Sequence, residues 1–127
     1  MSEEMAVRRV RPAERTHGQV TSGMHREQAL ATDRLWAGYV TTDAGSVSGW
    51  HHHGEYETTI YVVAGTLRME SGPGGAQVLD AVAGDFVYVP SRAIHREGNP
   101  SEETSALVVV RSGEGEPVIN VEGPAPA

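Results

Sequence analysis

The chain has 127 residues, no cysteine, and a formal net charge of −7 from 10 basic and 17 acidic residues. This length suits one domain with one core, and the lack of cysteine excludes thiolate metal sites, nucleophilic cysteine chemistry and disulfide bonds. The acidic balance argues against nucleic acid as a partner, because nucleic acids bind basic surfaces.

Membrane and secretion signals are also missing from the sequence. No apolar run approaches the roughly 20 residues that a membrane-spanning helix needs. The first four residues, Met-Ser-Glu-Glu, are acidic and lack the apolar segment of a signal peptide. We therefore expect a protein that does not bind membranes and that resides in the cytoplasm.

The elements predicted along the chain are short strands joined by turns. Residues 1–18 are polar and show no period, so we expect a flexible N-terminal arm. Residues 20–31 indicate either an edge strand or one helical turn. Alternating or β-branched segments bounded by turn residues then predict strands at 34–42, 49–53, 58–64, 66–70, 76–79, 86–89, 94–97, 106–110 and 117–121.

Turn residues separate these strands, and no segment has sustained helical periodicity. The Ser-Gly-Pro-Gly-Gly run at 71–75 predicts a hairpin loop, and the Pro- and Ala-rich residues 122–127 predict a flexible tail. The fold class expected is all-β, with about nine or ten strands and little or no helix. A jelly-roll barrel over residues 19–121 fits this pattern.

The most distinctive stretch is Trp-His-His-His-Gly-Glu-Tyr-Glu-Thr at residues 50–58. In a strand, side chains two residues apart share a face and lie roughly 7 Å apart along the chain. His51 and His53 would then share one face, while His52 points to the other. Two imidazoles on one face can converge on a single metal ion.

A third histidine can complete such a site. His95 is the favoured candidate because it lies on a short apolar strand that follows Pro90. His17 lies in the predicted arm, and His25 lies in the segment whose structure the sequence leaves open.

Two spaced patterns resemble the two motifs of the cupin family. The first consists of Gly45, His51, His53, Glu57 and Gly65, and the second of Gly84, Pro90, His95 and Asn99. In cupins these motifs supply histidines, and usually a glutamate, to one divalent metal inside a jelly-roll barrel. The resemblance, which spans residues 45–99, implies a small single-domain cupin whose metal ligands are His51, His53, Glu57 and His95.

The sequence departs from the cupin motifs at two positions. Counting back from Gly65 places Thr58 at the usual glutamate position, whereas parity with His51 favours Glu57. The site therefore holds either Glu57 with three histidines or three histidines alone. Arg92 stands where cupins usually have glycine, so we expect either a strained positive φ or a different turn.

The chemistry implied by this ligand set is that of a divalent transition metal. Imidazoles with one carboxylate suit Fe(II), Mn(II), Ni(II), Co(II) or Zn(II), and Ca(II) prefers oxygen ligands. Open metal positions resemble those of non-haem iron oxygenases, so the first expectation is a metal-dependent oxygenase-type enzyme, such as a dioxygenase, acting on a small organic molecule. The alternatives are a non-catalytic binding module and an isomerase or lyase acting on a sugar-like or keto substrate. The sequence identifies no catalytic acid or base.

Two further expectations concern partners. Arg34, Arg96 and Arg111 would bind an anionic substrate if they pointed inward, although surface positions are the default. Small barrels with a free edge strand commonly dimerise. We therefore expect a homodimer in which residues 20–31 add a strand to the neighbouring sheet.

Overall fold

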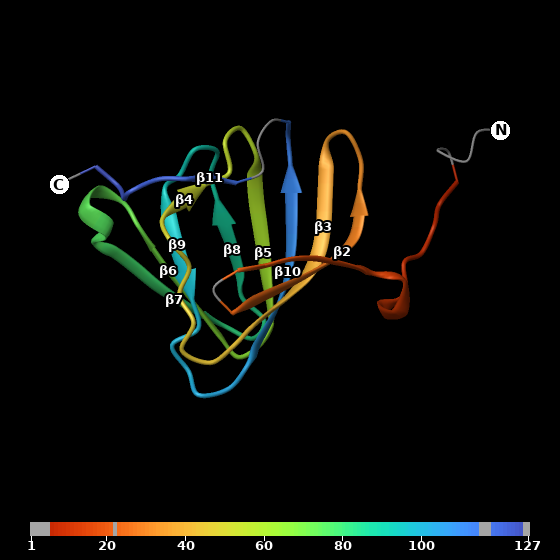
Figure 1. The fold of residues 1–127 in the computed structure, drawn as a ribbon, viewed down its shortest axis with the longest axis horizontal. Coiled ribbons are helices and arrows are strands. Elements are labelled where there is room, and N and C mark those ends of the chain that lie inside the picture. Colours follow the sequence, from red (N-terminus) through yellow and green to blue (C-terminus); the bar gives the residue numbers. More distant parts are fainter. Residues whose placement is uncertain (1–5, 22, 115–117, 126–127) are drawn as a thin grey trace.

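Two antiparallel sheets face each other in the computed structural model, which describes residues 6–21, 23–114 and 118–125 (Figure 1). The strands of the described chain are β1 (Thr16–Thr21), β2 (Met24–Ala31), β3 (Leu35–Thr42), β4 (His51–His52), β5 (Glu57–Ala64), β6 (Thr66–Ser71), β7 (Gln77–Val82), β8 (Phe86–Val89), β9 (His95–Gly98), β10 (Ser105–Ser112) and β11 (Ile119–Asn120). One sheet has the order β1-β2-β3-β10-β5-β8 and the other β11-β4-β9-β6-β7. The predicted all-β jelly-roll fold is confirmed, with slightly more strands than expected.

Helical structure is confined to two short 3₁₀ turns in the described residues. They span Pro12–Glu14 and Pro73–Gly75, and the second forms the loop predicted between β6 and β7. No helix of the described chain is long and apolar enough to span a membrane.

The N-terminal segment that the sequence left open is a hairpin of β1 and β2. Gly23 has a φ of 74° at the turn, a value that glycine adopts without strain. β1 begins at Thr16, inside the stretch predicted as a flexible arm, and residues 1–5 of that arm lie outside the described residues. β2 pairs with β1 on one side and β3 on the other, so the edge strand is β1 and β2 has no free edge for a neighbouring chain.

The core lies between the two sheets and follows the alternation of the strands. Inward positions of β5, β8 and β10 supply the buried side chains Ile60, Val62, Val87, Val89, Leu107 and Val109. The outward positions of β5 and β8 expose Tyr61, Phe86 and Tyr88. Along β10 the inward row continues past Val109 to Arg111, so the apolar core gives way to a polar interior at that end.

The C-terminal segment contacts the loop at 72–75. The backbone N–H of Gly74 donates a hydrogen bond to the carbonyl oxygen of Ala125 at 2.7 Å. The predicted tail of residues 122–127 is therefore attached at this point, and residues 126–127 lie outside the described residues.

Candidate metal centre and its cavity

Three histidines meet on the inner face of the five-stranded sheet. His51 of β4 lies directly opposite His95 of β9 in antiparallel register, so the two side chains point to the same side. His53 follows at the spacing that returns a side chain to this face. All three are buried, and one ring nitrogen from each lies within 4.8 Å of the others. The structure thus brings together the three histidines predicted as ligands.

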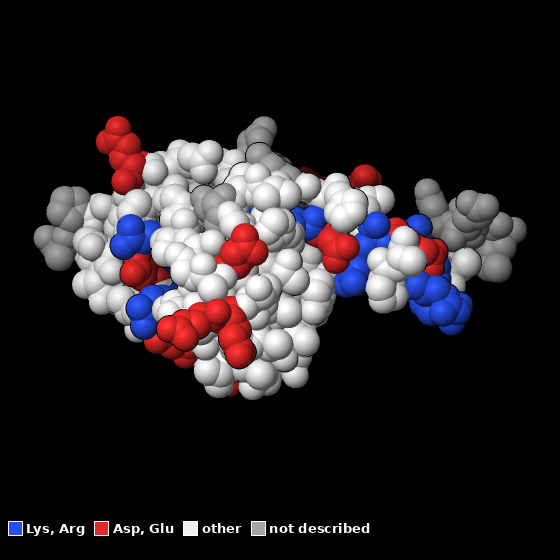
Figure 2. All heavy atoms as spheres, turned by 60° about the horizontal axis from the view of Figure 1, so that its bottom comes forward, with Lys and Arg blue, Asp and Glu red and all other residues white. Residues whose placement is uncertain are grey.

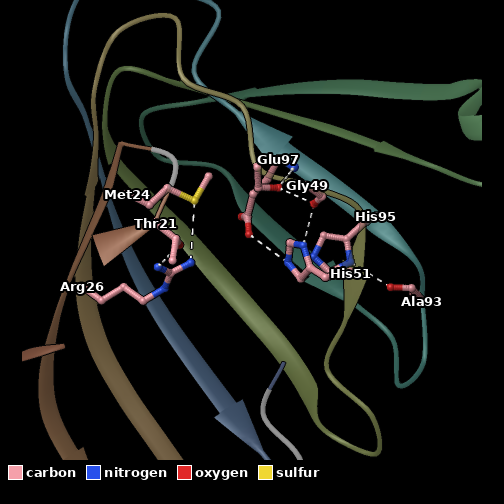
Figure 3. Close-up of polar contacts among 9 residues, drawn as sticks. Thr21, Met24, Arg26, Gly49, His51, Ala93, His95 and Glu97 are labelled. Carbon is pink, nitrogen blue, oxygen red and sulfur yellow. Dashed lines mark hydrogen bonds and ion pairs between the residues drawn. The ribbon is translucent and has the colours of Figure 1, made fainter. Parts of the chain in front are cut away.

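Backbone carbonyls orient two of these rings. The Nδ1–H of His51 donates to the carbonyl oxygen of Gly49 at 2.9 Å, and that of His95 donates to Ala93 at 2.8 Å (Figure 3). A carbonyl oxygen can only accept, so each Nδ1 carries a proton, and in the neutral form of each ring the lone pair lies on Nε2. Such contacts fix the orientation of metal-binding histidines in proteins.

The structure does not bring Glu57 to the histidines. Its side chain is exposed on the outer face of β5, where the Tyr88 hydroxyl donates a hydrogen bond to it at 2.5 Å. The backbone N–H of Tyr56 bonds to the carbonyl of His53 at 3.0 Å, and this turn interrupts the alternation that starts at His51. The alternation of inward and outward side chains therefore does not extend from His51 to Glu57, and the prediction that Glu57 is a ligand is corrected.

Thr58 takes the inward position instead. Its side chain is 2% exposed and lines a small inner pocket with His53 and His95. The Thr58 hydroxyl has no hydrogen-bond partner among the described residues. The alignment counted back from Gly65 therefore predicts the inward residue correctly, and the site has three histidines without a carboxylate from β5.

A carboxylate that the sequence reading missed comes from β9. Glu97 lies two residues after His95 on the same face, and its Oε1 is 3.5 Å from His51 Nε2 (Figure 3). Burial alone would raise the pKa of the Glu97 carboxyl, but the contact with His51 and the charges of the histidines lower it to about 2. The signal was present in the sequence, because His95 and Glu97 have the same i, i+2 spacing as His51 and His53.

The two cross-strand histidines differ in their electrostatic environment. Burial lowers the pKa of His51, but its contact with Glu97 outweighs burial, so this pKa lies above its ordinary value. Burial dominates at His95, whose pKa lies below its ordinary value. Glu97 thus favours a positive charge at His51, which is also what a bound metal cation would supply.

A cavity of about 690 Å³ reaches the histidines from the open end of the sheets, and His51 contributes to its lining. A pocket of about 20 Å³ continues inward past His53 and His95. Arg26 of β2 and Arg111 of β10 line both spaces. The histidine cluster therefore stands where a solvent-connected cavity meets the core.

Of the three arginines noted in the sequence, Arg111 is the one that points inward. It is 8% exposed, and its guanidinium lies over the Trp36 ring at 4.7 Å from the ring centre. Arg34 is exposed. Arg96 pairs with Glu70 and stacks on Trp50.

Arg92 adopts the positive φ expected of the glycine that it replaces, at 61°. Its side chain is exposed and pairs with Glu55. The substitution is therefore accommodated at the rim without reaching the histidine cluster.

The donor set fits a divalent transition metal. Three imidazoles converge with one ring nitrogen of each within 4.8 Å of the others, and an ionised carboxylate lies beside His51. Nitrogen donors of this kind suit Fe(II), Mn(II), Ni(II), Co(II) and Zn(II). The three buried histidines can bind one such ion.

Solved structures of three known proteins resemble the fold of this chain. The polyketide cyclase RemF from Streptomyces resistomycificus is 20% identical with a TM-score of 0.76, covering 91% of this chain and 86% of that one. KdgF from Halomonas sp. is 24% identical with a TM-score of 0.71, covering 84% of this chain and 94% of that one. Oxalate decarboxylase from Bacillus subtilis is 19% identical with a TM-score of 0.69, covering 80% of this chain but 29% of that one.

At these identities the similar structures support the fold alone. No curated protein sequence matches the chain significantly. The family model described as "Cupin domain" matches residues 38–122, which is more than half of the chain and includes all three histidines. The chain therefore belongs to the cupin family.

Proposed function

We propose that the chain is a divalent-metal-dependent enzyme of the oxygenase type, acting on a small organic molecule. The observation that carries this proposal is that the three-histidine cluster borders a large cavity through His51. The cavity volume of about 690 Å³ falls in the range of about 300–1,000 Å³ typical of small-molecule sites. A purely structural metal site would be closed and would need no such access.

The proposed roles follow from position. His51, His53 and His95 would hold the metal, the carbonyl of Gly49 would orient the His51 ring, and Glu97 would balance part of the added charge. A redox-active metal with this ligation supplies dioxygen activation beside a bound substrate. Trp36 and Leu35 line the cavity and provide an apolar wall that orients an organic ligand and displaces water from it.

A second candidate is an isomerase, lyase or cyclase that uses the metal as a Lewis acid. The observation that favours it is Glu97, an ionised carboxylate that lines the inner pocket and can accept a hydrogen bond from a substrate hydroxyl group. RemF is described as a polyketide cyclase, and the Bacillus subtilis oxalate decarboxylase as having Mn(II) centres, so similar folds carry reactions outside oxygenation. A non-catalytic binding module is the third candidate.

The test begins with metal content. Protein purified without a histidine tag is analysed for metals and then reconstituted with Fe(II), Mn(II), Ni(II), Co(II) and Zn(II) in parallel. Oxygen uptake by the Fe(II) form is measured with 1,3-diketones, catechols, flavonols and thiols. Stoichiometric metal with oxygen uptake supports the oxygenase. Metal binding with turnover but no oxygen uptake supports the Lewis-acid enzyme, and no metal binding contradicts both.

A homodimer remains a proposal, as does the cytoplasmic location. The free edge of β1 supports the dimer, since an unpaired edge strand can pair with another chain. Light scattering at high protein concentration measures the assembly directly, and a monomer under those conditions contradicts the proposal.

A further inference from the structure

The charge inside the cavity is opposite to that of the molecule. The chain has a net charge of −7, and acidic side chains gather on the outer surface at the end of the molecule that Figure 2 brings forward. Among the described lining residues of the large cavity, the guanidinium groups of Arg26 and Arg111 are present and no carboxylate is. A basic cavity in an acidic protein is the electrostatic environment expected of a site for an anion.

Arg111 occupies a position that an apolar side chain would fill if packing alone mattered. It continues the inward row of Leu107 and Val109 on β10, and its Nε has no hydrogen-bond partner among the described residues. Burying a guanidinium with unused donors is unfavourable unless a partner arrives. Glu97 attracts Arg111 through its charge, but its ion pair is with His51.

The guanidinium is held in a fixed orientation. Trp36 lies directly across from Arg111 in the register of β3 and β10, and its ring supports the guanidinium face. Trp36 is held in turn, because its indole N–H donates to Gln28 Oε1 at 2.9 Å. The N–H donors of arginine lie in the plane of the group, so stacking uses its face and leaves its edge for a planar acceptor.

Arg26 adds a second positive charge on the same side of the interior. It donates a hydrogen bond to the Thr21 hydroxyl at 2.8 Å, and it faces Glu97 and His51 across the space between the sheets (Figure 3). Arg26 and Arg111 together make this side of the interior basic, which favours an anionic group on a ligand.

We propose that the cavity binds an organic carboxylate, with Arg111 as the carboxylate-binding residue and Arg26 as a supporting charge. The apolar side chains Leu35, Trp36 and Val118 of the cavity would contact the body of the ligand. The proposal rests on the proposed function in one respect, since it places the rest of the ligand toward the histidines. It names the substrate class of that enzyme as carboxylic acids.

The experiment compares benzoate with benzamide, which has the same shape without the charge. Binding to the full chain is measured by ligand-observed NMR, first in metal-free protein dialysed free of chelator and then in the Zn(II) form. We expect benzoate to bind metal-free protein about 10- to 100-fold more tightly than benzamide, as a charged hydrogen-bonded pair predicts. Inorganic phosphate at equal concentration should not displace benzoate.

Variants assign the effect to Arg111. Arg111→Met, which keeps the length of the side chain, should abolish the preference for benzoate, and Arg111→Lys should retain part of it. Arg34→Met is the matched control, because it removes one positive charge at a side chain that is 84% exposed. It should leave benzoate binding unchanged.

Several outcomes would overturn the proposal. These are equal binding of benzoate and benzamide by the wild-type protein, no binding of either, displacement by phosphate, or a folded Arg111→Met variant that keeps the preference. The comparison of the two ligands on wild-type protein needs no variant to fold. Because the first measurement uses metal-free protein, it stands even if the chain binds no metal, and its failure leaves metal binding to be judged by metal analysis.

Discussion

The two sheets contribute different chemistry to one interior. The five-stranded sheet supplies His51, His95 and Glu97 from β4 and β9, and His53 directly follows β4. The six-stranded sheet supplies Arg26 and Arg111 from β2 and β10. One wall can therefore bind a cation while the facing wall can bind an anion, with a cavity between them.

The difference shows that a small jelly-roll fold can place cation-binding and anion-binding side chains on separate sheets. Within each sheet, cross-strand pairing places interacting groups side by side. His51 lies across from His95 on β4 and β9, and Arg111 lies across from Trp36 on β10 and β3. The histidines and the two guanidinium groups come from facing sheets, and two of the histidines line the same small inner pocket as both arginines, with Glu97 beside His51. Histidine and arginine substitutions should therefore act mainly on one wall each, whereas Glu97, whose charge reaches both the histidines and Arg111, should act on both.

The largest effect is expected from removal of a metal-binding histidine. His95→Ala takes one of three nitrogen donors and should lower metal affinity by more than the roughly 10- to 100-fold that loss of an outer-shell partner costs. His52→Ala is the matched control, because His52 points away from the cluster and accepts a hydrogen bond from the Gly54 N–H. Titration with Zn(II) against a competing chelator measures both, and equal losses would contradict the assignment.

Lower pH should weaken metal binding by the histidines without weakening benzoate binding by the arginines. Imidazoles must be neutral to bind a metal, so affinity should fall as pH drops, by about tenfold per pH unit for each imidazole that must lose a proton. The fall should begin at a higher pH for His51, whose pKa is raised, than for His95, whose pKa is lowered. Guanidinium groups keep their charge over this range, and a carboxylate ligand stays ionised above about pH 5. Benzoate binding to the metal-free protein should therefore persist at pH 5.5, where metal binding is weak. Metal affinity that is constant down to pH 4 would exclude histidine ligation.

Glu97→Gln should act on the two walls with opposite signs. Loss of the carboxylate removes one negative charge beside the histidines, so metal affinity should fall by about 10- to 100-fold. The same change removes the charge that partly compensates Arg111, so benzoate should bind the metal-free variant more tightly. Parallel titrations with Zn(II) and benzoate measure the two effects. A fall in both affinities would contradict the role of Glu97 as a charge that partly offsets Arg111.

The sequence predicted the parts of the molecule that depend on local pattern. The strands, the hairpin loop at 71–75 and the convergence of His51, His53 and His95 all follow from alternation and motif spacing. The prediction that Glu57 is a ligand is wrong because side chains do not alternate regularly between the two faces through the turn at 53–56. Glu97 carried a usable i, i+2 signal that was overlooked.

Arg111 shows what sequence pattern could not decide. Its alternation with Leu107 and Val109 indicates the inward face of a strand, but arginine there is unusual and a surface position was the expected default. The choice depends on Trp36, which comes from a strand about 75 residues earlier and meets Arg111 only through the pairing of β3 with β10. Such cross-strand contacts become visible only when the sheet order is known.

Thr58→Val tests the inward side of β5. Its buried hydroxyl has no partner among the described residues, so replacing it with a methyl group should leave the free energy of unfolding unchanged or raise it by up to about 1 kcal/mol. Metal affinity should stay within about twofold of wild type, because the three histidines are the proposed ligands. Chemical denaturation and Zn(II) titration check the two results. A large loss of metal affinity would make Thr58 part of the metal site.

Glu57→Gln should have the smallest effect and is the sharpest test of which side of β5 faces the metal. The substitution keeps the size of the side chain and an oxygen that can accept from Tyr88, but removes the negative charge. Since Glu57 lies on the outer face, metal affinity and benzoate binding should both be unchanged. The change should instead appear at Tyr88, whose pKa is raised by the hydrogen bond to Glu57 and should move back toward its ordinary value. Ultraviolet titration of the tyrosines measures this shift against a Tyr88→Phe reference, and a loss of metal affinity without it would place Glu57 inside the barrel after all.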